Sequence, residues 1–536
     1  MTSETTAALL AGYLSAAGVR HVFGYPGESV IEFMEAGRRA GLGMVSAVRE
    51  ASAAFMAEAA ASCTGLPGVC LSTLGPGSTA LLNGVASATL DRVPVLAISG
   101  QIETAREQYF THQVVDHNRL FAPVTKLAAR LEPASAGTVI RKALRTACAE
   151  RPGAVHLTVP ADVFGAPAGD TGVVVPPLAP AASTIDVYGP DPLPELRAAR
   201  RPVLLAGIGA MRCAASAELQ RLAEQAGIPV VTGPMAKGVF PEDHPYFAGV
   251  LDMAGHRVIW DLLARADLII SAGFDPVELI SPWSVGTPVL HVDTTPNTDQ
   301  VYQSGHEIVG NVAASLSWLA GQWRGEPRWA GREVAEHRRR LRAAWQAGRV
   351  AGQLNPSDVV AAVRYAAPED TILTADVGSH KIMAGQVWQA CTPRSVLMTN
   401  GLSAMGFGVP AALAAALSVP GRPVVALAGD GGFAMTATEM RLAAELGLPV
   451  VVVVFADGSL NRIELKQQTM GYPPEGTRIP PADLAAQAQA MGCDGVRVNT
   501  VTGLEKALGG LGRNGAGTRP LVIEAQIDPH QYEVQF

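Results

Sequence analysis

Two aspartates in the last quarter of the chain follow apolar runs that are typical of buried strands. Asp430 lies between glycines in LAGDGGF, and Asp457 ends the run VVVVVFAD. Five consecutive valines and a phenylalanine indicate a strand that is buried on both faces. If the two runs belong to one βαβ unit, both acids project from the same edge of one parallel sheet, where ligands bind.

Three glycines surround Asp430, at positions 429, 431 and 432. Gly429, Gly431 and Gly432 let backbone N–H groups approach an anion at the start of the following helix. Mg²⁺ is commonly held by one or two carboxylates together with phosphate oxygens. The pattern therefore favours a metal–diphosphate site over the alternative, in which Asp430 caps a helix and Asp457 begins a turn.

Three segments of the chain share one order of elements: 67–100, 201–233 and 422–458. Each has a short β-branched run, a glycine turn, a helix-like stretch and a second apolar run that opens with Pro-Val. This order predicts βαβ units with parallel strands and right-handed connections. One unit in each third of the chain predicts an α/β fold of three domains, each with a parallel sheet flanked by helices. The predicted domains are an N-terminal domain at 1–170, a central domain at 185–325 and a C-terminal domain at 350–536.

Two connectors separate these domains. Residues 164–183 are rich in Pro, Gly and Ala and are interpreted as a linker, whereas residues 324–349 are polar and basic. The basic run is interpreted as a solvated helix face rather than a nucleic-acid patch. In the central unit, Arg212 stands where a dinucleotide fingerprint needs its last glycine, so a nicotinamide cofactor gains no support.

Composition narrows the class of protein further. A chain of 536 residues is too long for one hydrophobic core and therefore indicates several domains. Its net charge of −7 argues against a nucleic-acid partner. Six scattered cysteines without a C-x-x-C pair argue against a zinc site or a disulfide framework. The N-terminus lacks a basic n-region, and the uncharged stretch 401–421 is interpreted as a glycine loop before a buried helix, not as a membrane span. We therefore expect no membrane association and a cytoplasmic location.

Several short motifs are distributed along the chain in a fixed order: FGYPGES (23–29), the segment around Glu50, STLGPGS (72–78), THQ (111–113), ADVGSHK (375–381), NGLSAMGFGVPAA (400–412) and GDGGF (429–433). In this order they resemble the thiamine diphosphate-dependent superfamily of acetolactate synthases and pyruvate decarboxylases, and the resemblance covers essentially the whole chain. The superfamily usually has asparagine at the position of Asp457. Catabolic acetolactate synthases look similar to this chain in having aspartate there and in the motif THQ.

The resemblance implies a cofactor role for the residues that match it. Glu50 would hydrogen-bond the aminopyrimidine ring, the Ser403 carbonyl would accept from its amino group, and Met405 would hold the two rings in a V shape. The carbonyl of Ser459 would join the two aspartates as a magnesium ligand. Further cofactor contacts are implied for Pro26, Gly27, Thr73, Gly378, Ser379, His380 and Leu460.

On the substrate side, the resemblance places His112 and Gln113 near the reacting carbonyl. Glu464 matches an acidic residue used by decarboxylases, whereas Arg462 beside it could meet a substrate carboxylate, and the sequence does not choose between them. His380 and Lys381 are hypothesised to offset the extra negative charge of Asp457.

The function implied is decarboxylation of a pyruvate-like 2-oxo acid followed by carboligation to an acceptor, with thiamine diphosphate and Mg²⁺ as cofactors. One alternative is a simple decarboxylase that releases an aldehyde, and another is a non-catalytic protein that keeps the fold. In this superfamily the active site forms between subunits, so a homodimer or homotetramer is expected. FAD in the central domain is possible, but no motif supports it.

Overall fold

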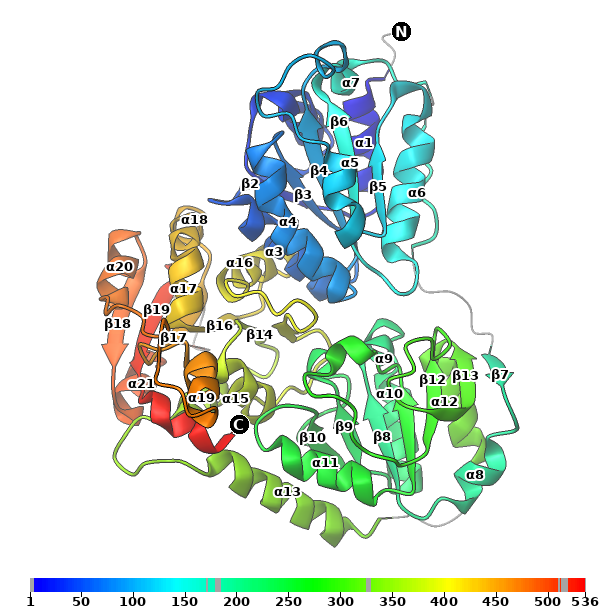
Figure 1. The fold of residues 1–536 in the computed structure, drawn as a ribbon, viewed down its shortest axis with the longest axis vertical. Helices are drawn as coiled ribbons and strands as arrows, with labels where there is room; N and C mark the ends of the chain where they lie inside the picture. Colours follow the sequence, from blue (N-terminus) through cyan, green and yellow to red (C-terminus); the bar gives the residue numbers. More distant parts are fainter. Residues whose placement is uncertain are drawn as a thin grey trace. The chain divides into compact units, whose positions relative to one another are not determined.

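The computed structural model describes residues 4–169, 172–178, 185–323, 329–509, 511 and 519–535. They form two compact units, each of which is described by itself. The first unit comprises Met1–Ala179, Gly401–Gly421 and Thr436–Leu448, and the second comprises Pro180–Asn400, Arg422–Met435 and Pro449–Phe536. The predicted α/β class is confirmed, because three sheets flanked by helices make up the fold (Figure 1).

The first unit contains a six-stranded, fully parallel sheet with the order β2-β1-β3-β4-β6-β5. The strand order reverses between β1 and β3, which makes their carboxyl ends the expected place for a ligand. The predicted unit at 67–100 is confirmed as β3, α4 and β4. The strands are β1 (His21–Gly24), β2 (Gly43–Ser46), β3 (Gly68–Ser72), β4 (Val95–Gln101), β5 (Leu127–Arg130) and β6 (Val155–Pro160). The helices are α1 (Thr6–Ala16), α2 (Ile31–Arg39), α3 (Glu50–Thr64), α4 (Pro76–Leu90), α5 (His117–Phe121), α6 (Ala136–Cys148) and α7 (Ala161–Gly165).

Two later helices also belong to the first unit: α16 (Gly408–Ser418) and α18 (Met440–Glu445). Helix α16 is short and largely buried, and it packs on α3, where the rings of Phe55 and Phe407 meet edge to face at 5.8 Å. The prediction of a glycine loop before a buried helix is therefore confirmed. Among the residues that the structure describes, no helix is both long and apolar enough to cross a membrane.

The central sheet of the second unit has the order β10-β9-β8-β11-β12-β13-β7. It differs from the fully parallel sheet that was predicted, because its edge strand β7 pairs antiparallel with β13. The strands are β7 (Ile185–Tyr188), β8 (Pro202–Ala206), β9 (Val230–Thr232), β10 (Phe247–Val250), β11 (Leu268–Ala272), β12 (Val289–Asp293) and β13 (Ser304–Gly310). The helices are α8 (Leu193–Ala198), α9 (Ile208–Arg212), α10 (Ser216–Ala226), α11 (His256–Arg265) and α12 (Val312–Gln322).

The last sheet is parallel throughout, with the order β15-β14-β16-β17-β19-β18. The valine run forms β17, whose first six residues are buried, and it pairs with β16 so that Gly429 lies opposite Phe455. The strands are β14 (Ile372–Ala375), β15 (Val396–Met398), β16 (Val424–Gly429), β17 (Val450–Ala456), β18 (Asp494–Val498) and β19 (Leu521–Gln526). The helices are α14 (Pro356–Ala366), α15 (Ser379–Val387), α17 (Asp430–Thr436), α19 (Asn461–Thr469), α20 (Leu484–Ala490) and α21 (Val501–Ala507).

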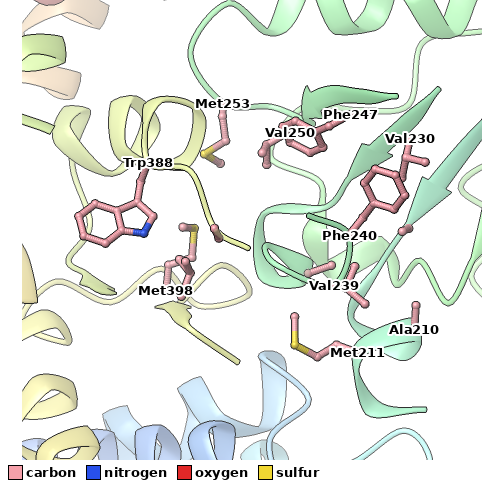
Figure 2. Packing of buried hydrophobic residues seen from close by; sticks show 14 of the residues in the cluster. Ala210, Met211, Val230, Val239, Phe240, Phe247, Val250, Met253, Trp388 and Met398 are labelled. Carbon is pink, nitrogen blue, oxygen red and sulfur yellow. The ribbon is translucent and has the colours of Figure 1, made fainter. Parts of the chain in front are cut away.

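One apolar core runs through both sheets of the second unit (Figure 2). It is accompanied by a fully buried ion pair, in which Lys237 Nζ lies 2.7 Å from Glu242 Oε1. The same ammonium donates to the Trp388 carbonyl at 2.9 Å, and Glu242 accepts from the N–H of Ala390 at 3.1 Å. Because a buried charge is costly without its partners, these bonds fix the central sheet against the segment that precedes β15.

The basic connector forms α13 (Gly331–Gln346), which buries Val334, His337 and Leu341, so the expected helix is confirmed. Residues 324–328 of this connector and residues 170–171 and 179–183 of the predicted linker lie outside the described part of the chain. The structure describes all six cysteines, and none of them forms a disulfide bond. The strands of each sheet fall within the three predicted domain ranges, whose exact boundaries stay a prediction.

Candidate active site

Two acids lie at the ends of neighbouring strands in the last sheet. Strand β16 ends at Gly429 and β17 ends at Ala456, so Asp430 and Asp457 follow directly at the same sheet edge. The Asp430 carboxylate accepts hydrogen bonds from Gly431 N at 2.8 Å and from Gly458 N at 2.7 Å. The second bond joins the two loops, and the prediction that both acids leave one edge of one sheet is confirmed.

The electrostatics of this pair favour a cation. Burial raises the pKa of Asp457 to about 7, and the negative charge of Asp430 acts in the same direction. Burial also raises the pKa of Asp430, although hydrogen bonds from backbone N–H groups oppose the shift. Two carboxylates that repel each other in a half-buried place are stabilised by a proton or by a divalent ion.

Magnesium fits the donor set, since it takes oxygen ligands and usually keeps water and phosphate oxygens. Within the described residues, no group of three or more His, Cys, Asp or Glu side chains could hold a metal. A metal at Asp430 and Asp457 therefore needs further oxygens from a backbone carbonyl, such as that of Ser459, from phosphate or from water. Magnesium binding itself stays a prediction.

A second loop lies beside the first. Strand β14 is followed by Gly378, which has a φ of +154°, and a Cβ there would lie 2.8 Å from the His380 ring. A Cβ on Gly429 would lie 3.2 Å from the same ring, so the two glycine loops are in contact. Ser379 opens α15, a helix of nine residues whose N-terminal N–H groups can stabilise an anion. The structure thus brings the residues predicted to bind diphosphate together.

The His380 ring lies at the contact between the two glycine loops. The ring is buried and stacks on Phe455 with 5.5 Å between centroids, and burial lowers its pKa to about 3. Burial therefore disfavours a charged imidazole in the protein without cofactor, and the hypothesis that His380 and Lys381 offset the charge of Asp457 stays a prediction. Lys381 remains a cation of this loop, with Nζ donating to Thr399 O at 2.6 Å and to Asn400 Oδ1 at 3.0 Å.

Helix α19 begins at Asn461, shortly after Asp457 in the sequence. Glu464 is buried, and one of its oxygens lies 2.8 Å from the Arg478 guanidinium while the other accepts a hydrogen bond from the Ser459 hydroxyl. Arg462 is exposed on the same turn. Leu460 N donates to Thr477 O at 2.7 Å, which fixes the backbone between the predicted metal ligands and α19.

The first unit holds the other predicted group, at the carboxyl ends of β1 and β3. Glu50 is the first residue of α3 and is half-buried, and a Cβ on Gly77 would lie 3.1 Å from its Oε1. The Thr73 side chain lies close to Gly27, where an added Cβ would be 2.5 Å from it. The hydroxyls of Thr73 and Ser29 are 3.1 Å apart. Glu50, Thr73 and Gly27 are thus gathered at the switch in strand order.

The remaining predicted residues of this unit lie on loops. His112 and Gln113 are exposed, and the Gln113 carbonyl would be 2.5 Å from a Cβ on Gly75, so the THQ loop contacts the turn after β3. Ser403 and Met405 are half-buried in the loop that leads to α16, and Ser403 has a φ of +51°. Pro26 is exposed in the turn after β1.

Glu439 is a residue that the sequence did not single out. It is 1% exposed, and its carboxylate oxygens accept from Val48 N at 3.0 and 3.2 Å. Val48 lies two residues before Glu50, so this carboxylate fixes the backbone from which the predicted catalytic helix starts. No local pattern marks Glu439, because its partner is hundreds of residues away in the chain.

Glu278 was also missed, and it lies at the switch in strand order of the central sheet. Its buried carboxyl accepts from Ile208 N at 2.8 Å, and burial raises its pKa to about 8. A Cβ on Gly207 would lie 2.4 Å from Glu278 Oε2, and one on Gly233 would lie 2.1 Å from Oε1. The carboxyl therefore occupies the place beside the glycine turn where a dinucleotide phosphate binds in related sheets.

Three segments of the chain match domains of known proteins. Residues 4–120 match the N-terminal TPP binding domain of thiamine pyrophosphate enzymes, residues 193–319 match the central domain, and residues 376–525 match the C-terminal TPP binding domain. The chain belongs to the thiamine pyrophosphate enzyme family.

Among its relatives is the catabolic acetolactate synthase of Raoultella terrigena, which is 31% identical over 93% of this chain and 91% of that protein. An acetolactate synthase of Bacillus subtilis is 28% identical over 95% of this chain and 91% of that protein. A Pseudomonas aeruginosa protein named probable 2-ketoarginine decarboxylase is 30% identical over 95% of this chain and 91% of that protein.

The pKa of Asp457 predicts how the metal-free protein responds to pH. Between about pH 4 and pH 7 the unfolded chain releases this proton while the folded chain keeps it, so the contribution of Asp457 to the free energy of unfolding falls as pH rises. Asp457→Asn removes this slope, and added Mg²⁺ stabilises the native protein more at about pH 8 than at pH 6. Thermal unfolding without and with Mg²⁺ measures both effects. The control is Glu369→Gln at an exposed site, and parallel pH curves for the native protein and Asp457→Asn would contradict the account.

The contact at Val48 predicts a second effect. Glu439→Ala removes a charged acceptor from the segment before α3 and lowers the free energy of unfolding by about 1–2 kcal/mol, whereas Glu439→Gln retains part of the contact. Urea unfolding followed by circular dichroism is the measurement. Glu445→Ala, at an exposed position of α18, is the matched control, and equal stability of the two alanine variants would show that the contact is unimportant.

Proposed function

We propose that this protein decarboxylates a pyruvate-like 2-oxo acid and joins the resulting two-carbon unit to an acceptor, as an acetolactate synthase-like enzyme. The observation that carries the proposal is the pair of acids at neighbouring strand ends, beside two glycine loops and a helix N-terminus. Relatives named acetolactate synthase, similar over nearly the whole chain, support it.

The residues of the second unit would hold the cofactor. Asp430, Asp457 and the Ser459 carbonyl would bind Mg²⁺, while the loops at Gly378 and Gly429 and the start of α15 would bind the diphosphate. Bound thiamine diphosphate supplies an electron sink for the pair that a 2-oxo acid leaves behind when it loses CO₂.

In the first unit, Glu50 would hold a proton against the aminopyrimidine nitrogen, and the contact between Glu439 and Val48 fixes the turn from which Glu50 projects. His112 and Gln113, exposed on their loop, would orient the reacting carbonyl. We propose that the active enzyme is an assembly of at least two chains, in which Glu50 of one chain serves the diphosphate group of the next.

The surroundings of Glu464 support carboligation over simple decarboxylation. A decarboxylase that releases an aldehyde must deliver a proton to the reacting carbon. Both oxygens of Glu464 are already engaged, one by Arg478 and the other by Ser459. We therefore favour carboligation, because Glu464 would have to give up one of these bonds before it could reach the reacting carbon.

A decarboxylase is the second candidate function. The relative named probable 2-ketoarginine decarboxylase is as similar to this chain as the acetolactate synthases are, and Glu464 is an acid beside the proposed metal site. The third alternative, a non-catalytic protein that keeps the fold, predicts that no thiamine diphosphate binds.

Product analysis separates these candidates. With thiamine diphosphate and Mg²⁺, two molecules of pyruvate should give one molecule of acetolactate and one of CO₂, and a second 2-oxo acid or an aldehyde should yield a mixed product. Mass spectrometry of a panel of 2-oxo acids is the measurement. Glu50→Gln should lower the rate by about 100- to 10,000-fold, the range expected for loss of an acid–base group.

Two outcomes would contradict the proposed reaction. Free acetaldehyde as the main product from pyruvate would favour the decarboxylase, as would turnover of a larger 2-oxo acid with pyruvate untouched. A Glu50→Gln variant within tenfold of the native rate would remove Glu50 from the chemistry, with Glu445→Gln, at an exposed site, as the matched control.

A further inference from the structure

The last turn of the chain, η8 (Pro529–Gln535), is bonded to the loops of the proposed cofactor site. Asn461 opens α19, two residues after Ser459, and its Nδ2 donates to Pro529 O at 3.0 Å. Its Oδ1 accepts from the Ser379 hydroxyl at 2.7 Å. One amide therefore links the start of α15, the start of α19 and η8, and Figure 1 shows the red segment that includes η8 beside these two helices.

Two glutamines fix the other side of η8. Gln531 Nε2 donates at 3.0 Å to both Gln353 Oε1 and Asn355 Oδ1. Gln535 Nε2 donates to carbonyls at the end of α13, including that of Ala347 at 2.9 Å. With both sides bonded, the residues between the two glutamines keep a defined position.

Tyr532 lies between these anchors and buries its hydroxyl. The side chain is 1% exposed, and its oxygen has no hydrogen-bond partner among the described residues. A buried hydroxyl without a partner is unfavourable, and in native proteins such groups usually meet a ligand or an ordered water.

The charges near this hydroxyl are the two predicted metal ligands. Burial raises the pKa of Tyr532 well above its usual value, and the carboxylates of Asp457 and Asp430 raise it further. The phenol therefore stays protonated near neutral pH and is a hydrogen-bond donor within electrostatic reach of both acids.

We propose that the Tyr532 hydroxyl is a binding group of the metal–diphosphate site, donating to an oxygen that arrives with the cofactor. The acceptor is a diphosphate oxygen or a water on the metal, both of which carry negative charge density. This inference rests on the proposed cofactor site and adds a donor from the far end of the chain. A neutral donor at this place offsets part of the charge that Asp457 adds where the superfamily usually has a neutral asparagine.

The test is Tyr532→Phe in the full-length chain, because phenylalanine keeps the ring and removes only the donor. Isothermal titration of the metal-free protein with thiamine diphosphate in the presence of Mg²⁺ should give a Kd raised by about 10- to 100-fold, as for a hydrogen bond to a charged acceptor. The melting temperature of the cofactor-free variant should equal or exceed that of the native protein, since no bond is lost in that state. Tyr365→Phe, at a side chain 95% exposed, is the matched control.

Each contrary outcome has a separate meaning. If the native protein and Tyr532→Phe bind the cofactor equally well, this inference is overturned and the proposed function stays intact. A lower melting temperature without cofactor, together with an unchanged Kd, would show that the hydroxyl has only a structural role, and it would also overturn the inference. Native protein that binds no thiamine diphosphate would overturn the proposed function and this inference together.

Discussion

Repulsion between the carboxylates of Asp430 and Asp457 is the constraint on which the rest of this site depends. Parallel pairing of β16 and β17 sets Gly429 opposite Phe455, so the residues that follow each strand must emerge side by side. Both strands are buried over most of their length, and the sheet cannot shift register to separate Asp430 from Asp457 without exposing its apolar face. A divalent cation is the simplest partner for such a pair.

Other features of the second unit reduce the cost of that repulsion. The Asp430 carboxylate accepts from Gly431 and Gly458, which spreads its charge over two peptide groups. The His380 ring, whose pKa is lowered by burial, stacks on Phe455 beside these loops. In the first unit, the position of Glu50 has to be fixed. Glu439 fixes the backbone before Glu50, and the Glu50 carboxyl itself stays half-buried.

Much of this fold could be predicted because local patterns specify it. The valine run, the glycine turns and the Pro-Val openings indicate βαβ units, and a parallel sheet then requires that Asp430 and Asp457 share one edge. The lowered pKa of His380 was not predictable, because it depends on burial of the ring. The roles of Glu439, Glu278 and Tyr532 were also hidden, since each depends on partners that are distant in the chain. Antiparallel strand β7 was missed because it is short and follows a segment interpreted as a linker.

The central claim is tested most directly by a crystal structure of the protein with thiamine diphosphate and Mn²⁺, which stands in for Mg²⁺ and can be located by its anomalous scattering. We expect one ion at about 2.0–2.2 Å from a carboxylate oxygen of Asp430 and from one of Asp457, with diphosphate oxygens completing its shell. An ion bound by only one of the two acids, or at another place in the chain, would contradict it.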